Sequence, residues 1–273
     1  MGYIQNSQPE IFALRPAPVQ INYLAYPGTL GASYIDYIIM DKMALSDEEE
    51  VLEKPIYMPA SYFITDNKFA INISKKKSDY NLPDNKFIFA SFNKQNKIDE
   101  EILDIWSEIL RSKKDSILWI YSDNKIAEQN LVKEFNKRDI EPDRIYFMAN
   151  ENRESHLARI KLADICLDCM QVSAHTTAID CLWSGNIIIT LKGNKIINRA
   201  ASSILNAANL GECIANDKED YVEKVLFFAN NSNELGKIKK QIAANVKNTD
   251  LFNTEKYVSE FENKILEICQ NKM

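Results

Sequence analysis

Strand-like and helix-like segments alternate through the middle of this sequence, and that alternation restricts the fold more than any other feature. Short apolar runs typical of buried strands are separated by segments with the apolar spacing of helices. The expected strands are 87–91, 117–121, 145–148, 165–167 and one that begins at 187, and the expected helices are 100–111, 126–136, 153–162 and 178–183. Such alternation predicts an α/β fold with a parallel sheet covered by helices on both faces.

The segments on either side of this region are predicted to form a smaller N-terminal unit and a helical tail. Short strands are expected at 19–25, 37–40 and 56–58, and further helices at 200–208, 218–230, 235–246 and 254–272. Residues 60–86 have the composition of a linker, and its basic run Lys75-Lys76-Lys77 is expected to be solvated. We therefore expect two units, residues 1–60 and residues 61–273.

Composition excludes several classes of partner. The net charge of -6 and the pI near 5.2 argue against nucleic acid and anionic membranes, which bind clustered positive charge. No apolar run approaches the roughly 20 residues of a membrane span, so a cytoplasmic location is expected. The five cysteines are expected to be reduced and mostly buried. Cys166 and Cys169 have the spacing of a metal or redox pair, but without a second pair or a nearby histidine cluster we expect no metal.

The most polar turn in the alternating region follows the strand 165–167. His175, Thr176 and Thr177 stand where a helix is expected to begin, and the free N–H groups of a helix N-terminus bind anions such as phosphate. Asp180 falls on the same helix face as Thr176 and could reach a sugar hydroxyl. The alternative is an ordinary capped helix with a solvated acid.

Two other loops at strand ends carry matching chemistry. Lys94 and Lys97 follow the first strand, and Arg153 and His156 follow the third, with Arg159 one turn further on. Ligands of open α/β sheets bind at this edge, so we expect these side chains to share a pocket with the His175 turn. The lysines would meet a diphosphate, an imidazole would stack on a base, and Asp180 would bind a ribose.

Three separated motifs closely resemble the catalytic region of the protein O-GlcNAc transferases. They are PEIFALRPAPVQINYLAYPGTLGASYIDYII at 9–39, FNKQNKID at 92–99 and LADICLDCMQVSAHTTAIDCLWSG at 162–185, and the resemblance extends to LFNTEKY at 251–257. The family implies a GT-B fold, in which residues 61–273 form the Rossmann-like C-terminal lobe and residues 1–60 are a remnant of the N-terminal lobe. It also implies transfer of N-acetylglucosamine from UDP-GlcNAc to Ser or Thr of proteins without a catalytic metal.

Residue roles follow from the same resemblance. Lys97 and His175 resemble the family's catalytic pair beside the diphosphate, and Pro27, Gly28 and Thr29 resemble the loop beside the sugar. The remaining UDP-sugar-binding candidates are Lys94, Arg153, His156, Arg159, Thr176, Thr177 and Asp180.

The sequence departs from the family at several of these positions. Lys94-Gln95-Asn96-Lys97 replaces the usual Gln-x-Tyr-Lys, Val172 replaces a cysteine of the animal enzymes, and Arg153 replaces a lysine. The match begins late in the family's first lobe, so that lobe's histidines and the upstream tetratricopeptide repeats are expected to be absent. We therefore expect UDP-GlcNAc or UDP-hexose binding with weak or no transfer. The alternative is a non-catalytic nucleotide-binding or protein-interaction module.

Overall fold

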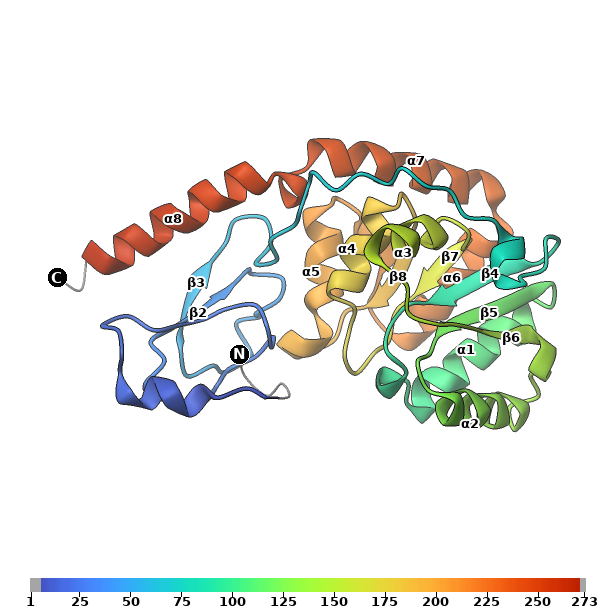
Figure 1. The fold of residues 1–273 in the computed structure, drawn as a ribbon, viewed down its shortest axis with the longest axis horizontal. Helices are drawn as coiled ribbons and strands as arrows, with labels where there is room; N and C mark the ends of the chain where they lie inside the picture. Colours follow the sequence, from blue (N-terminus) through green and yellow to red (C-terminus); the bar gives the residue numbers. More distant parts are fainter. Residues whose placement is uncertain (1–5, 271–273) are drawn as a thin grey trace.

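The chain forms two units joined by a long connecting segment, residues 58–86 (Figure 1), in a computed structural model that describes residues 6–270. The larger unit holds a six-stranded, fully parallel sheet in the order β6-β5-β4-β7-β8-β9. Its strands are β4 (Phe87–Ser91), β5 (Ser116–Tyr121), β6 (Ile145–Met148), β7 (Ile165–Leu167), β8 (Ile188–Leu191) and β9 (Ile214–Ala215). The chain builds outward from β4 in one direction and then from β7 in the other. The sheet is therefore doubly wound, with its switch point between β4 and β7.

Helices cover both faces of this sheet. α1 packs with α2 and α6, and α4 packs with α3, α5 and α7. The bounds are α1 (Glu100–Ser112), α2 (Lys125–Asn136), α3 (Arg153–Ile160), α4 (Thr176–Trp183), α5 (Ala200–Ala207), α6 (Lys218–Asn230), α7 (Ser232–Asn248) and α8 (Thr254–Gln270). The 3-10 turns are η1 (Pro9–Leu14), η2 (Lys77–Tyr80), η3 (Gln95–Lys97), η4 (Pro142–Arg144), η5 (Ile196–Asn198), η6 (Gly211–Cys213) and η7 (Asp250–Phe252).

Local sequence explains where the helices around the site begin and end. The side chains of Asp99, Asn124 and Asn152 accept backbone N–H bonds at the starts of α1, α2 and α3, as capping residues do. α4 ends just before Gly185, whose φ of 75° is in the left-handed region that glycine adopts without strain. These signals fix the loops that lie at the carboxyl edge of the sheet.

The smaller unit is a three-stranded parallel sheet, β1-β2-β3, formed by Ile21–Asn22, Tyr37–Met40 and Lys54–Tyr57. Its core contains Ile38, Ile39 and Met40, and it extends across the unit boundary to Ile196 and Ala200. The buried hydroxyl of Ser203 on α5 donates to Oδ2 of Asp41 at 2.5 Å. The two units are therefore linked by apolar contact and by a buried hydrogen bond.

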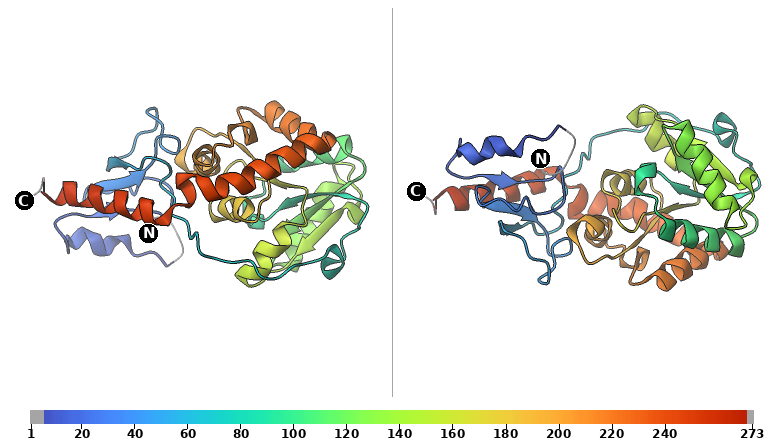
Figure 2. Two further views of the ribbon diagram at one scale, coloured as in Figure 1. Left: turned by 90° about the horizontal axis from the view of Figure 1, so that it is seen from above. Right: turned by 90° about the horizontal axis from the view of Figure 1, so that it is seen from below.

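α8 extends beyond the larger unit and runs along the smaller unit (Figures 1 and 2). Tyr257 donates its hydroxyl proton to the carbonyl oxygen of Tyr62 at 2.8 Å, and its hydroxyl lies 2.7 Å from that of Tyr23. Phe261 packs its ring against Tyr23. The last helix of the chain therefore packs in space against the first unit, while the expected boundary at residue 60 stays a prediction.

The expected α/β class is confirmed, and most expected elements lie within two residues of their observed positions. The strand predicted at 19–25 is shortened to Ile21–Asn22, because Leu24 adopts a φ of 71° that an extended strand does not permit. The short β9 was not expected. Of the predicted helix 254–272, the last two residues lie outside the described part of the chain.

Candidate functional site

A cavity of about 550 Å³ lies at the carboxyl edge of the large sheet, next to its switch point. All nine candidates that the sequence placed in residues 61–273 line it, and the structure thus brings three distant loops together. The lining residues are Phe92, Asn93, Lys94, Lys97, Tyr121, Asn150, Glu151, Arg153, His156, Arg159, His175, Thr176, Thr177 and Asp180.

The positive end of the cavity lies between η3 and α4. Nζ of Lys97 donates to Oδ1 of Asn93 and to the carbonyl oxygen of Ser173, both at 3.1 Å, while Lys94 is exposed at the rim. The first N–H bond within α4 runs from Ala178 to the carbonyl oxygen of His175. The earlier N–H groups of the helix have no carbonyl partner within it, so this end of the cavity is suited to an anion.

His175 contributes a neutral ring to this end. Burial and the neighbouring Lys97 cation lower the pKa of His175 to about 4, so the imidazole is uncharged at neutral pH. Its Nε2 is buried and has no hydrogen-bond partner among the residues that the structure describes. A buried polar atom without a partner is costly, and a ligand in the cavity could supply the missing bond.

The opposite end of the cavity is formed by α3. Arg159 is almost fully buried and donates from Nη2 to Nδ1 of His156 at 3.0 Å and from Nη1 to the carbonyl oxygen of Ala149 at 2.6 Å. Burial, with the charges of Arg159 and Arg153, lowers the pKa of His156 to about 4. A guanidinium only donates, so Nδ1 of His156 is the acceptor and the ring proton lies on Nε2. Arg159 therefore acts on the cavity mainly through His156.

Asp180 lies between these two ends, on the first turns of α4. Oδ1 of Asp180 is 3.0 Å from Nη2 of Arg153, and its Oδ2 is 3.8 Å from Nε2 of His156. Burial raises the pKa of Asp180 to about 6, although the Arg153 cation opposes the rise. The carboxyl is thus mainly ionised at neutral pH and offers an acceptor to a hydroxyl group.

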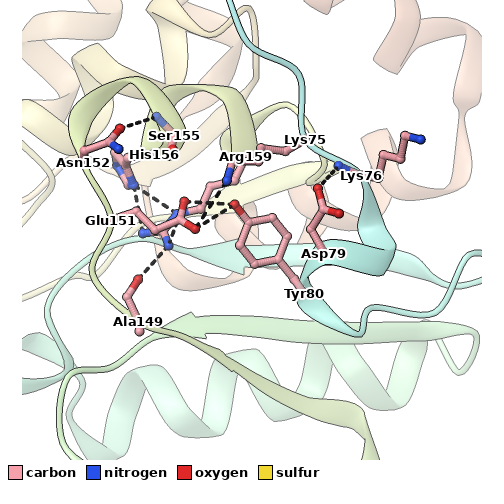
Figure 3. A network of polar contacts seen from close by, with 10 residues as sticks. All are labelled: Lys75, Lys76, Asp79, Tyr80, Ala149, Glu151, Asn152, Ser155, His156 and Arg159. Carbon is pink, nitrogen blue, oxygen red and sulfur yellow. Dashed lines mark hydrogen bonds and ion pairs between the residues drawn. The ribbon is translucent and has the colours of Figure 1, made fainter.

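A network of polar contacts joins the connecting segment to α3 and the loop before it (Figure 3). The Tyr80 hydroxyl lies within 3.1 Å of both carboxylate oxygens of Glu151, to which it donates. Nζ of Lys75 is 3.7 Å from one of these oxygens, and Nη1 of Arg159 is 3.7 Å from the other. The carboxylate of Glu151 therefore holds the connecting segment against the guanidinium that orients His156.

The connecting segment is more than the linker that its composition suggested. Cζ of the Arg153 guanidinium lies 5.2 Å from the centre of the Phe69 ring. The Phe63 ring packs edge-on against the His175 ring, with 6.4 Å between the two ring centres. The expectation of a solvated basic run is wrong for Lys75, which pairs with Glu151. Aromatic residues in a polar segment were the signal for these contacts, because such residues seldom remain in solvent without a partner surface.

The loop Pro27-Gly28-Thr29 is not among the residues that line the cavity. It belongs to the smaller unit, where the Thr29 hydroxyl donates to Oε2 of the buried Glu53 at 2.5 Å and the Gly28 carbonyl oxygen accepts from Nδ2 of Asn22 at 2.9 Å. Its role beside a sugar stays a prediction. Asn93 and Glu151 also line the cavity but were not predicted to do so, because neither residue type is distinctive at a strand end.

Solved structures with the same arrangement define the class of the fold. A mutant of the Thermobaculum terrenum O-GlcNAc transferase superposes with a TM-score of 0.87 at 23% identity, covering 96% of this chain and 50% of that one. Sucrose-phosphate synthase from Thermosynechococcus elongatus superposes with a TM-score of 0.63 at 14% identity, covering 87% and 59%. The fold is that of the GT-B glycosyltransferases.

Sequence comparison then identifies the family. The profile of Glycosyl transferase family 41 matches residues 1–77 and 68–261, and the chain belongs to that family. It is 36% identical over 270 residues to the probable UDP-N-acetylglucosamine--peptide N-acetylglucosaminyltransferase SEC of Arabidopsis thaliana, covering 96% of this chain and 28% of the relative. It is 24% identical to the UDP-N-acetylglucosamine--peptide N-acetylglucosaminyltransferase of Caenorhabditis elegans, covering 96% and 33%. The chain thus spans about a third of these relatives or less.

Residues 6–270 contain no group of three or more His, Cys, Asp or Glu side chains placed to hold a metal ion. Within the same range, no helix combines the length and the apolar character needed to cross a membrane. Four of the five cysteines are buried free thiols, and Cys269 is partly buried.

Proposed function

We propose that this chain is the donor-binding part of a glycosyltransferase that moves N-acetylglucosamine, or a related hexose, from a UDP-sugar to Ser or Thr hydroxyls of proteins. The observation that carries the proposal is the convergence of Lys97, the start of α4 and the α3 histidine in one cavity. The names of the two relatives support the donor and the peptide acceptor. The cysteines buried as free thiols support a reducing, cytoplasmic location.

Each part of the donor has a chemically matched place in this proposal. The diphosphate would meet Lys97, Lys94 and the N–H groups at the start of α4, the base would lie against His156, and the ribose hydroxyls would donate to Asp180. As the sugar leaves UDP, negative charge grows on the diphosphate. Fixed cations and N–H groups stabilise that charge without having to reorganise. Because protein groups supply this charge, we also propose that no metal is needed.

Calorimetric titration of UDP into the purified chain tests the proposal. Lys97→Ala should weaken binding by roughly 1.5 to 3 kcal/mol, because it removes a charge-assisted contact to phosphate. Lys94→Ala is the matched control and should cost less, since Lys94 is exposed at the rim. Addition of EDTA should leave the affinity unchanged. Absence of UDP binding would refute the site, and equal losses in the two variants would remove Lys97 from it.

A further inference from the structure

A fully buried carboxylate lies beneath the positive end of the cavity. Asp168 follows β7, and its Oδ1 accepts hydrogen bonds from Nδ2 of Asn93 at 3.1 Å, from the N–H of Cys169 at 2.7 Å and from the N–H of Ala174 at 2.8 Å. Its Oδ2 accepts from the Thr190 hydroxyl at 2.7 Å. A buried charge is tolerated only where donors surround it, and these four donors fix the carboxylate in place. Asp168 does not itself line the cavity.

The carboxylate determines which way the Asn93 amide faces. An ionised carboxylate accepts hydrogen bonds and donates none, so Asn93 presents its nitrogen to Asp168 and its oxygen to the opposite side. That oxygen accepts the 3.1 Å bond from Nζ of Lys97. The charge of Asp168 thus sets the orientation of the Asn93 amide. Two hydrogen bonds through that amide connect Lys97 to Asp168.

The second acceptor of Lys97 depends on the same carboxylate. Nζ of Lys97 also donates to the carbonyl oxygen of Ser173 at 3.1 Å. Ser173 lies in the turn between Cys169 and Ala174, and Oδ1 of Asp168 binds the N–H group at each end of that turn. The turn leads directly to His175 and the start of α4. One carboxylate therefore holds both acceptors of Lys97 and the segment from which α4 begins.

We propose that Asp168 is a positioning residue that, through Asn93 and the turn 169–174, places the Lys97 ammonium and the start of α4 to bind a diphosphate. This inference rests on the proposed function for the identity of the ligand, and on geometry alone for the placement of Lys97. It assigns Asp168 no contact with the ligand.

Ligands that share the nucleoside but differ in phosphate separate positioning from general structural support. We would titrate UDP, UMP and uridine into the parent chain, Asn93→Ala and Thr190→Val. In Asn93→Ala the ratio of uridine Kd to UDP Kd should fall roughly tenfold, because Lys97 loses the hydrogen bond that positions its ammonium group. The uridine Kd itself should stay within about twofold of the parent value. Thr190→Val removes only the bond to Oδ2 and leaves the three bonds to Oδ1, so the ratio should change by less than about twofold. An unchanged ratio in Asn93→Ala overturns the inference.

A second measurement needs no nucleotide and keeps this inference distinct from the proposed function. Acetylation of lysines by a small amine-reactive ester, followed by mass spectrometry, should label Lys97 more slowly than the exposed Lys94 in the parent chain. In Asn93→Ala and Asp168→Asn, labelling of Lys97 should accelerate several-fold relative to Lys94. Equal rates for Lys97 in parent and Asn93→Ala refute the placement, whether or not UDP binds. If Asp168→Asn does not fold, Asn93→Ala alone decides.

Discussion

The protonation states of single side chains determine the charge and the hydrogen-bond donors that the cavity offers to an anion. Both imidazoles are held neutral, with pKa values near 4, whereas burial raises the pKa of Asp168 and of Asp180 to about 6. At neutral pH the histidines can donate one hydrogen bond each without adding charge, and both carboxylates are mostly ionised. The positive charge at the end of the cavity between η3 and α4 therefore comes from Lys97 and Lys94, with the helix dipole added to it.

These pKa values make stability depend on pH in a predictable direction. The pKa of His156 falls from 6.5 in the unfolded chain to about 4 in the folded one, so the unfolded state binds a proton between these values and the folded state does not. The stabilisation is complete above pH 6.5 and is lost as the pH falls toward 4. Between pH 7 and pH 4, His156→Gln should gain about 3 kcal/mol of unfolding free energy relative to the parent.

Urea unfolding of both chains across this pH range measures the difference. Asp180→Asn is the control of opposite sign. The pKa of Asp180 is raised from 3.8 to about 6, so its contribution is complete below pH 3.8 and is lost as the pH rises through 6. Relative to the parent, Asp180→Asn should therefore lose stability as the pH falls from 7 to 4. Parallel curves for parent and His156→Gln would contradict the assigned burial of the imidazole.

Tyr80 allows a test of the polar network that joins the connecting segment to α3. Tyr80→Phe removes a hydroxyl that donates to the Glu151 carboxylate and keeps the ring, which packs on Trp119 at 5.0 Å between centres. The loss of a hydrogen bond to a charged group should cost about 1.5 to 3 kcal/mol of unfolding free energy. Tyr121→Phe, whose hydroxyl makes only an exposed 3.5 Å bond to Asp123, should cost less than about 0.5 kcal/mol. Denaturant unfolding compares the two, and equal costs would show that the Tyr80 hydroxyl adds no more stability than the exposed Tyr121 hydroxyl.

Among the helices, α8 determines how firmly the smaller unit is held. Tyr257 packs on Phe261 and bonds to Tyr62, and both side chains lie against the core of the first sheet. Tyr257→Ala should lower the local stability of the smaller unit by about 1 to 2 kcal/mol. Amide hydrogen exchange in β1, β2 and β3 should then accelerate roughly 5- to 30-fold, while β4 to β8 keep their protection. Leu266→Ala, at a residue 58% exposed on the same helix, should change neither sheet. Uniform loss of protection in both sheets would mean that α8 supports the whole chain.

Helices and strands were predictable from sequence wherever the pattern is local. Apolar runs and helical apolar spacing located α1 to α7 and β4 to β8 closely, because each signal acts within a few residues. The surface against which α8 packs was not predictable. An amphipathic pattern indicates that one face of a helix is buried, but not which distant surface covers that face. The same limit applies to Asn93, Asp168 and Glu151. Their partners lie on other strands or in the connecting segment, and only the folded sheet brings them together.

Taken as one molecule, the chain forms the proposed donor cavity from a single unit. Every residue that lines the cavity lies between Phe92 and Asp180, and the sugar-side loop 27–29 is engaged by Asn22 and Glu53 within the smaller unit. In the proposed function, the described residues would contact the donor from one side only, whereas an acceptor in the GT-B fold would lie between two lobes. Binding and transfer are therefore expected to separate in this chain.

We predict that the 273-residue chain binds UDP and UDP-GlcNAc but transfers the sugar slowly or not at all. Alignment of two reactants can account for roughly 7 to 11 kcal/mol of a barrier, far more than the cavity contacts can replace when the acceptor is not held. Radiolabelled UDP-GlcNAc incubated with a Ser/Thr-rich peptide measures transfer, and calorimetry on the same sample measures binding. Lys97→Ala is the control, because it should weaken the binding signal and leave the low transfer signal unchanged. Rapid transfer by the purified chain would show that residues 1–273 already align an acceptor, whereas binding without transfer would identify this chain as a donor-binding module.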